Sequence, residues 1–205
     1  MFDTIYHEHT SYHSIFALRT FLQRYDLEIF EIERISAHGG SVRVHICRTG
    51  TRVVSSSVEL LIREESESKI NELETWSLFA ERIDNLKTRV HEELDILVSK
   101  GERIIGYGVP AKFATLFHVL ELDRFQFEYL IDDNELKIGG YGPGTRIEIK
   151  SYEEFSKSGG ADNIFLFSWN YSTEIVEKLV SNKLVRGKIL VPLPELQLKE
   201  EIASN

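Results

Sequence analysis

Four short apolar segments in the second half of the chain place the strongest constraint on its fold. They read RIIGY at 103–107, FEYLI at 127–131, IFLF at 164–167 and KILV at 188–191. Between them the residue spacing predicts helices, one after Pro110 through about Leu120 and one over 172–182. Apolar strands that alternate with helices are typical of a mostly parallel, doubly wound α/β sheet with flanking helices. We therefore predict one such domain over residues 101–195, followed by a short tail over 196–205.

Residues 1–50 predict a helix followed by a β-hairpin. A helix over 14–25 has its apolar side chains at helical spacing, with Ser14 as a suitable N-cap. Residues 27–35 and 41–48 alternate apolar and polar side chains around a Gly-Gly turn at 38–40. A helix and a hairpin need a larger sheet to pack on. We interpret this region as the remnant of another domain, its terminal helix and hairpin.

Residues 51–100 are predicted to link the two regions, largely through one long helix. Apolar side chains recur every three or four positions over 64–100, and no Pro or Gly interrupts them. Such a helix would be roughly 45–50 Å long at 1.5 Å per residue. It would connect two modules or form the association seam of a homo-oligomer. The alternative is a solvated helix packed along one domain.

Composition and charge argue against several classes of partner and site. The chain has 33 Asp and Glu against 24 Lys and Arg, a net charge of −9, which argues against nucleic acid or an anionic membrane as a partner. No apolar run approaches the roughly 18 residues of a membrane span, and we expect no secretory signal. The single cysteine, Cys47, excludes an internal disulfide and a cysteine-based metal site. We expect a cytoplasmic protein.

The strongest local motif is G-x-G-x-x-A at 106–111, directly after the first apolar strand. Gly106 permits a tight turn, Gly108 lets a phosphate approach the backbone, and Ala111 allows a helix to pack closely on the strand. Pro110 suits the first turn of that helix. Asp132 ends the next strand, where an acceptor for a ribose hydroxyl would stand. The motif predicts a Rossmann-like nucleotide site; a tight βα turn without a ligand is the alternative.

A second group of candidate residues is Tyr6-His7-Glu8-His9. A His can act as a general base near neutral pH, and a Glu can orient its imidazole. The spacing of these histidines and His13 would also suit a metal, but no supporting ligands accompany them, and we predict no metal site. The alternative interpretation is a solvated polar loop.

Three further side chains are candidates for ligand contacts. Lys112 lies in the first turn of the predicted helix and can contact a phosphate, whereas Trp169 and Asn170 follow the third predicted strand. Ligands bind at this carboxyl edge in open α/β sheets, although core packing is the more frequent role of Trp. The predicted ligand-binding set comprises Gly106, Tyr107, Gly108, Pro110, Ala111, Lys112, Asp132, Trp169 and Asn170.

Five segments, in order along nearly the whole chain, resemble the C-terminal part of bacterial sugar C-methyltransferases. They are DTIYHEHTSYHS, LEIFEIERISAHGGSVRVHICR, GYGVPAK, IDDNELKIGGYGPGT and FLFSWNY. The enzymes of this family use S-adenosylmethionine (SAM) to methylate a carbon of nucleotide-linked deoxy-keto-sugars. In the family, a zinc-binding region and a SAM-binding domain precede a Rossmann-like C-terminal domain that contributes to substrate binding.

The resemblance implies roles for individual residues. His9 would remove the proton beside the keto group, and Tyr6 and Glu8 would position or assist it. The turn that carries Lys112 would lie near the nucleotide-sugar. The sequence departs from the family in lacking the cysteine cluster for zinc and the glycine-rich SAM motif, so the chain resembles a truncated or split methyltransferase.

Three hypotheses remain open at this point. In the first, the chain is the substrate-binding portion of a sugar C-methyltransferase and is inactive alone. The SAM of the complete enzyme then binds outside this chain, and the chain itself holds no cofactor tightly. The second is a dinucleotide-binding module or small NAD(P)-dependent oxidoreductase, which rests on the glycine motif and Asp132. The third is a non-catalytic partner of a separate zinc- and SAM-binding methyltransferase subunit.

Overall fold

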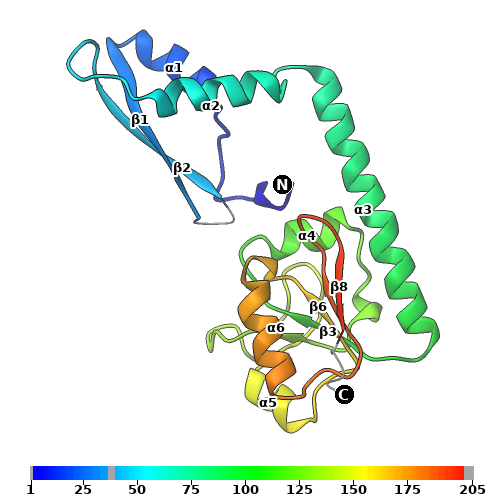
Figure 1. The fold of residues 1–205 in the computed structure, drawn as a ribbon. Helices are drawn as coiled ribbons and strands as arrows, with labels where there is room; N and C mark the ends of the chain where they lie inside the picture. The colour runs from blue at the N-terminus through cyan, green and yellow to red at the C-terminus, as the bar shows by residue number, and fades with distance from the viewer. Residues whose placement is uncertain (1, 37–39, 201–205) are drawn as a thin grey trace. The chain divides into compact units, whose positions relative to one another are not determined.

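The computed structural model describes residues 2–36 and 40–200, which divide into two compact units (Figure 1). The C-terminal unit combines residues 1–9 with 82–205, and the hairpin unit comprises residues 10–81. The division falls within helix α3 (Leu73–Ser99). The first residues of the chain therefore group with its second half, which the predicted boundaries at 50 and 100 do not anticipate. None of the described helices is long and apolar enough to cross a membrane.

The C-terminal unit is built on a six-stranded sheet in the order β5-β4-β3-β6-β7-β8. Neighbouring strands are parallel except β7 and β8, which are antiparallel. This is the predicted α/β fold, a mostly parallel sheet flanked by helices. The strands are β3 (Ile104–Tyr107), β4 (Leu130–Ile131), β5 (Ile149–Lys150), β6 (Asn163–Leu166), β7 (Lys188–Val191) and β8 (Gln197–Glu200).

Burial of apolar side chains explains the central strands. Every residue of β3 and of β6 is buried, as expected for a sheet covered on both faces. Three phenylalanines pack closely beside them: the ring centroids of Phe165 and Phe167 are 4.8 Å apart, and those of Phe113 and Phe167 are 4.6 Å apart. Full burial of one such side chain contributes about 1.5–3 kcal/mol. This aromatic cluster is therefore a main source of stability in the unit.

Three short helices connect the strands: α4 (Phe113–Val119), α5 (Tyr152–Lys157) and α6 (Ser172–Ser181). His91 Nε2 of α3 donates to the carbonyl oxygen of Leu120 at 2.8 Å, so α3 lies against the end of α4. Asn182 Nδ2 donates to the Tyr152 hydroxyl at 3.4 Å, so α5 lies beside the end of α6. In this unit α3 buries a stripe of side chains at helical spacing: Leu86, Val90, Leu94 and Leu97.

Three parts of the C-terminal unit differ from the prediction. Strand β4 has two residues rather than five, and β5 and α5 were not predicted at all. The tail predicted over 196–205 is wrong for its first part, because Gln197–Glu200 form β8, antiparallel to β7. This segment, QLKE, has one apolar residue among four, which suits a strand at the edge of a sheet but does not mark one in the sequence.

The hairpin unit packs two helices on a two-stranded antiparallel sheet. Helix α1 (Ile15–Gln23) begins after Ser14, whose Oγ accepts the backbone N–H of Ala17 at 3.1 Å. Strands β1 (Leu27–Ile35) and β2 (Ser41–Arg48) pair with a bulge between Ile29 and Glu31, and helix α2 (Ser56–Glu67) completes the small core. The predicted helix and hairpin are confirmed; 38 and 39 of the predicted turn lie outside the described residues.

The long helix predicted over 64–100 is confirmed over Leu73–Ser99 (α3), but its continuation back to residue 64 is wrong. Helix α2 ends at Glu67 and α3 begins at Leu73, with Lys69 between them at φ 54°. Two local hydrogen bonds stabilise the break: Ser68 Oγ donates to the Glu65 carbonyl at 2.8 Å, and Trp76 Nε1 donates to the Ile70 carbonyl at 2.7 Å. No Pro or Gly stands at this point, so the apolar spacing runs through the break without a signal.

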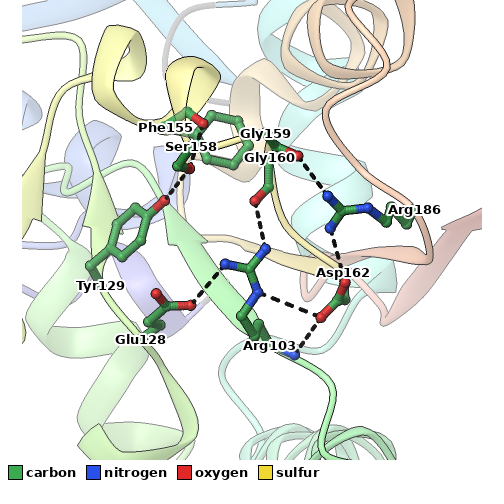
Figure 2. Close-up of polar contacts among 9 residues, drawn as sticks. All are labelled: Arg103, Glu128, Tyr129, Phe155, Ser158, Gly159, Gly160, Asp162 and Arg186. Carbon is green, nitrogen blue, oxygen red and sulfur yellow. Dashed lines mark hydrogen bonds and ion pairs between the residues drawn. The ribbon is translucent and has the colours of Figure 1, made fainter.

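A charged network joins the start of β3 to the loop before β6 (Figure 2). Asp162 accepts the backbone N–H of Arg103 at 2.9 Å and the Arg186 Nη1 group at 3.1 Å. The two arginines also donate to the carbonyl oxygens of Gly160 at 3.0 Å and Gly159 at 2.9 Å. The backbone N–H of Arg103, and then the two guanidinium groups, lower the pKa of Asp162 against the opposing effect of burial.

Asp162→Asn is expected to lower the free energy of unfolding by about 1–3 kcal/mol at pH 7, since hydrogen bonds to a charged acceptor are worth about that much. A carboxyl group whose pKa is lowered by folding stabilises the protein above its unfolded pKa, and this stabilisation is lost as the pH falls through the folded pKa. The difference between the two proteins should therefore shrink below about pH 4. Urea unfolding at pH 7 and pH 3 measures it.

The matched control is Glu153→Gln, which removes an ion pair with Lys157 in which both side chains are exposed. It should change stability by less than about 0.5 kcal/mol. A deficit in Asp162→Asn that is equally large at both pH values would contradict the role given to the Asp162 charge.

Candidate functional site

The strand order reverses between β3 and β6, and ligands of open α/β sheets bind at the carboxyl edge beside such a reversal. Strand β3 ends at Tyr107, and β6 ends at Leu166. The backbone N–H groups of Phe167 and Ser168 both donate to the Tyr107 carbonyl, at 2.9 and 3.2 Å. The ends of the two strands are therefore bonded directly to each other at the predicted site.

Both glycines of the G-x-G-x-x-A motif face side chains of this chain. A Cβ at Gly106 would lie 2.5 Å from Leu130 Cδ2 and 2.8 Å from Phe167 Cε2. A Cβ at Gly108, where φ is +89°, would lie 1.8 Å from Ser168 Oγ. The close approach that the motif predicts for a phosphate is thus made by internal packing.

Asp132 closes the same turn from within the protein. Its Oδ2 accepts the backbone N–H of Val109 at 2.7 Å and the Lys137 ammonium at 3.0 Å, and its Oδ1 accepts the N–H of Asn134 at 2.9 Å. Only 8% of Asp132 is exposed. A carboxylate on a turn N–H occupies the place of an anion and repels a phosphate brought to the same group. The geometry therefore favours the ligand-free interpretation of this turn over a dinucleotide site.

Helix α4 begins later than predicted. Its first residue is Phe113 and its N-cap is Lys112, while the N–H of Phe113 donates to the Pro110 carbonyl at 2.8 Å. The prediction that Pro110 and Lys112 lie in the first helical turn is wrong, because the turn after β3 continues through both. Lys112 is therefore placed by the turn, at the helix boundary.

Lys112 binds a side chain from the beginning of the chain. Asp3 lies in a 3₁₀ turn, η1 (Phe2–Thr4), and is completely buried. Its Oδ2 is 2.8 Å from Lys112 Nζ and accepts the indole N–H of Trp169 at 2.7 Å. Lys112 also donates to Asn170 Oδ1 at 3.0 Å. Two members of the predicted ligand-binding set thus contact Asp3, and a third, Asn170, contacts Lys112; we call these four residues the Asp3 cluster.

The three predicted catalytic side chains form one hydrogen-bonded group directly after η1. His9 Nδ1 lies 2.9 Å from the Thr4 carbonyl oxygen, and because a carbonyl only accepts, Nδ1 carries the hydrogen. The Tyr6 hydroxyl lies 3.3 Å from His9 Nε2 and 3.4 Å from Glu8 Oε2, and its single hydrogen can be donated to only one of them at a time. Across residues 2–36 and 40–200, no group of three or more His, Cys, Asp or Glu side chains is arranged to hold a metal ion.

The structure brings the two predicted groups together in one unit. The Asp3 cluster ties η1 to the turn after β3, and Thr115 Oγ1 of α4 donates to the Ile5 carbonyl at 3.0 Å. The segment that carries Tyr6, Glu8 and His9 is therefore attached to the turn that carries Lys112. Asp132 is not part of this group, since its bonds go to the loop after β4 and to Val109.

A second polar group lies at the same edge of the sheet, and most of it was not predicted. The Tyr107 hydroxyl donates to Asp133 Oδ2 at 3.1 Å and accepts from Lys178 Nζ at 3.2 Å. Lys178 Nζ lies 3.6 Å from the centroid of the Tyr152 ring. Burial first, and then the charge of Asp133, raise the pKa of both tyrosines, so both stay neutral. Asp133, Tyr152 and Lys178 come together only through tertiary structure, and no sequence pattern marks them.

Comparison with known proteins decides the family. The C-methyltransferase C-terminal domain profile matches residues 36–194, most of the chain. The chain belongs to this family. C-methyltransferase NovU of Streptomyces niveus is 31% identical over 195 residues, which cover 95% of this chain and 46% of NovU. The chain thus spans about half the length of this curated relative, and the resemblance read from the sequence is confirmed, with a methyltransferase-related role.

In this C-methyltransferase C-terminal domain, Gly108→Ala is expected to lower the free energy of unfolding by about 2–5 kcal/mol. A positive φ costs a side chain about 1–2 kcal/mol, and overpacking against Ser168 adds about 1–3 kcal/mol. Chemical denaturation measures the change. Adding Ser168→Gly to the variant should recover the overpacking part alone.

Gly139→Ala is the matched control, because Gly139 has φ +78° and a Cβ there would meet nothing within 4 Å. It should cost only the about 1–2 kcal/mol of backbone strain. Equal losses at positions 108 and 139 would mean that Ser168 does not fill the space beside Gly108.

Proposed function

We propose that this chain is the C-terminal, substrate-binding portion of a C-methyltransferase that acts on a nucleotide-linked deoxy-keto-sugar. The family match supports the reaction class, and the coverage of 46% of NovU supports a portion of a larger enzyme. In this proposal zinc and SAM bind outside these 205 residues, in a separate subunit or in further polypeptide. The chain alone is then inactive, and its partners are the nucleotide-sugar and the SAM-binding portion.

One observation carries the catalytic assignment: the hydrogen bond from His9 Nδ1 to the Thr4 carbonyl. It leaves Nε2 as the basic nitrogen of a neutral imidazole. Histidine suits proton removal near neutral pH. We assign to Nε2 the removal of the proton from the carbon beside the keto group.

Tyr6 and Glu8 support this base. Once His9 has taken a proton, Nε2 becomes a donor, and the Tyr6 oxygen at 3.3 Å can accept from it. The Tyr6 hydrogen then goes to Glu8 Oε2, 3.4 Å away. The hydroxyl group of Tyr6 thus links the imidazole to the Glu8 carboxylate and orients the ring.

The electron pair left on carbon delocalises into the carbonyl oxygen as an enolate. When bound in the rest of the enzyme, SAM would supply an electrophilic methyl group to this carbon, its sulfur keeping the electron pair of the broken bond, and the keto group would be restored. In this scheme the described residues bind and orient the sugar and take the proton.

We place the nucleotide-sugar at the carboxyl edge of the sheet, beside the Tyr6–His9 segment. Ala111 is exposed and Pro110 is half-buried, so this part of the predicted set presents surface to a ligand. Lys178 is 37% exposed in its side chain and lies next to Tyr107. An ammonium group in that position can contact a phosphate.

The isolated chain is expected to bind a nucleotide-linked deoxy-keto-sugar and not SAM, because in this proposal SAM binds outside these 205 residues. Isothermal titration calorimetry with the two ligands measures this. Tight binding of SAM without binding of the sugar would overturn the proposal. Fluorescence titration with NADH is the companion measurement, and a response there would favour the oxidoreductase alternative.

His9→Gln is expected to slow removal of the substrate proton by about 10²–10⁴-fold, the usual contribution of a general base. The assay is deuterium exchange at the carbon beside the keto group, followed by NMR with the chain supplemented by its SAM-binding portion. Affinity for the sugar should stay within about threefold, since the lost group acts on the proton.

His13→Gln is the control, as His13 is exposed and outside the hydrogen-bonded group. An exchange rate that falls equally in both variants would contradict the assignment of the base.

A further inference from the structure

Asp3 is a charged residue with no exposed surface, placed one residue before Thr4. An ionised carboxylate out of water is costly unless a charge and hydrogen bonds compensate it. Lys112 and Trp169 supply both, at 2.8 and 2.7 Å from the same oxygen. Such an interaction holds η1 in one position.

The Lys112 ammonium group makes two further contacts within the protein. Besides Asp3 it bonds to Asn170 Oδ1 at 3.0 Å and lies 4.3 Å from the centroid of the Trp169 ring. Its side chain is 14% exposed. A phosphate bound to Lys112 would have to displace the Asp3 carboxylate or lie beside it, and like charges in such a site repel.

Asp3 Oδ1 is buried and has no hydrogen-bond partner among the described residues. One oxygen of the carboxylate therefore makes all the polar contacts. An asparagine keeps one such oxygen without the charge but places a buried NH2 group at the position of Oδ1, so Asp3→Asn is compared with Lys112→Met, which removes the pair from the other side. The structure itself thus provides a near-isosteric test of the ion pair.

We propose that Asp3 is a positioning residue for His9. Its pair with Lys112 fixes η1, and η1 presents the Thr4 carbonyl that accepts the His9 Nδ1 hydrogen and sets the tautomer. The inference rests on the proposed function for the role of His9 as the base. It assigns Lys112 and Trp169 to the N-terminal segment, in place of the nucleotide-sugar contact expected from the sequence.

A second bond to the same segment reinforces the arrangement. Thr115 Oγ1 donates to the Ile5 carbonyl at 3.0 Å, on the residue that follows Thr4. Side chains of the turn after β3 and of α4 thus hold the chain on both sides of Thr4. The hydrogen bond between His9 and Thr4 therefore fixes the position of the imidazole within the C-terminal unit.

The test uses the chain itself, without ligand, and ¹⁵N NMR. The His9 ring signals should report one tautomer, with hydrogen on Nδ1, in the unaltered protein. In Asp3→Asn they should shift towards the mixture shown by the exposed His13 in the same spectrum. The Trp169 indole N–H should move upfield, while that of Trp76, bonded to the Ile70 carbonyl, stays in place as an internal reference.

Lys112→Met should reproduce the tautomer shift, and the double variant should add nothing, because both substitutions remove one interaction. Glu153→Gln, at an exposed ion pair, should leave both signals unchanged. Trp169→Phe removes the indole hydrogen bond to Asp3 and also changes the ring beside Lys112, and it provides a second comparison if Asp3→Asn fails to fold. Thermal unfolding of each variant separates a loss of stability from a change of tautomer.

An unchanged His9 tautomer in folded Asp3→Asn would overturn the proposal. So would weaker sugar binding in Lys112→Met alone, which would return Lys112 to the substrate. Failure of the proposed function looks different: no sugar binding and no exchange of the substrate proton, with the tautomer shift still present.

Discussion

Close packing between the ends of β3 and β6 is the constraint on which the C-terminal unit depends. Because Gly106 has no side chain, Phe167 packs over it, and because Gly108 has none, Ser168 approaches the turn. Two chain segments follow this contact: the turn from Gly108 to Lys112, and the residues after Ser168. Those two segments run side by side and provide the cation and the indole group that bind η1. The position of the N-terminal segment is thus a consequence of how two strands meet.

The same contact explains why the glycine motif is a poor guide to a ligand. G-x-G-x-x-A requires a tight turn and a close approach to the backbone, and here side chains of the protein make that approach. The decisive residue is Asp132: placed to bind a ribose, it instead accepts the N–H of Val109. A motif of this kind specifies backbone geometry, and the group that fills the geometry is visible only in three dimensions.

Elements with nearly complete burial were predictable from the sequence, and elements at the edges were not. Apolar runs in the sequence mark strands β3, β6 and β7, whereas β5 has only two residues and β8 has one apolar residue among four. The break after Glu67 has no Gly or Pro to mark it. One part of the candidate site was likewise predictable from the sequence and another part was not. Tyr6, Glu8 and His9 were predicted as a motif, but the ion pair that joins their segment to Lys112 links residues distant in sequence, and a single acidic residue carries no periodicity.

The boundaries of the family and of the compact unit differ, and the difference bears on how the site works. The family match begins at residue 36, while the unit that contains the sheet also takes in residues 1–9. An apolar contact between these parts would tolerate several packings, since hydrophobic cores accept volume-conserving changes. A buried ion pair is less tolerant, because detaching one partner leaves the other charge uncompensated. A base must lie within hydrogen-bond reach of the proton that it removes. If His9 is that base, the C-terminal domain serves catalysis by fixing where the imidazole stands, in addition to any contact that it makes with the sugar.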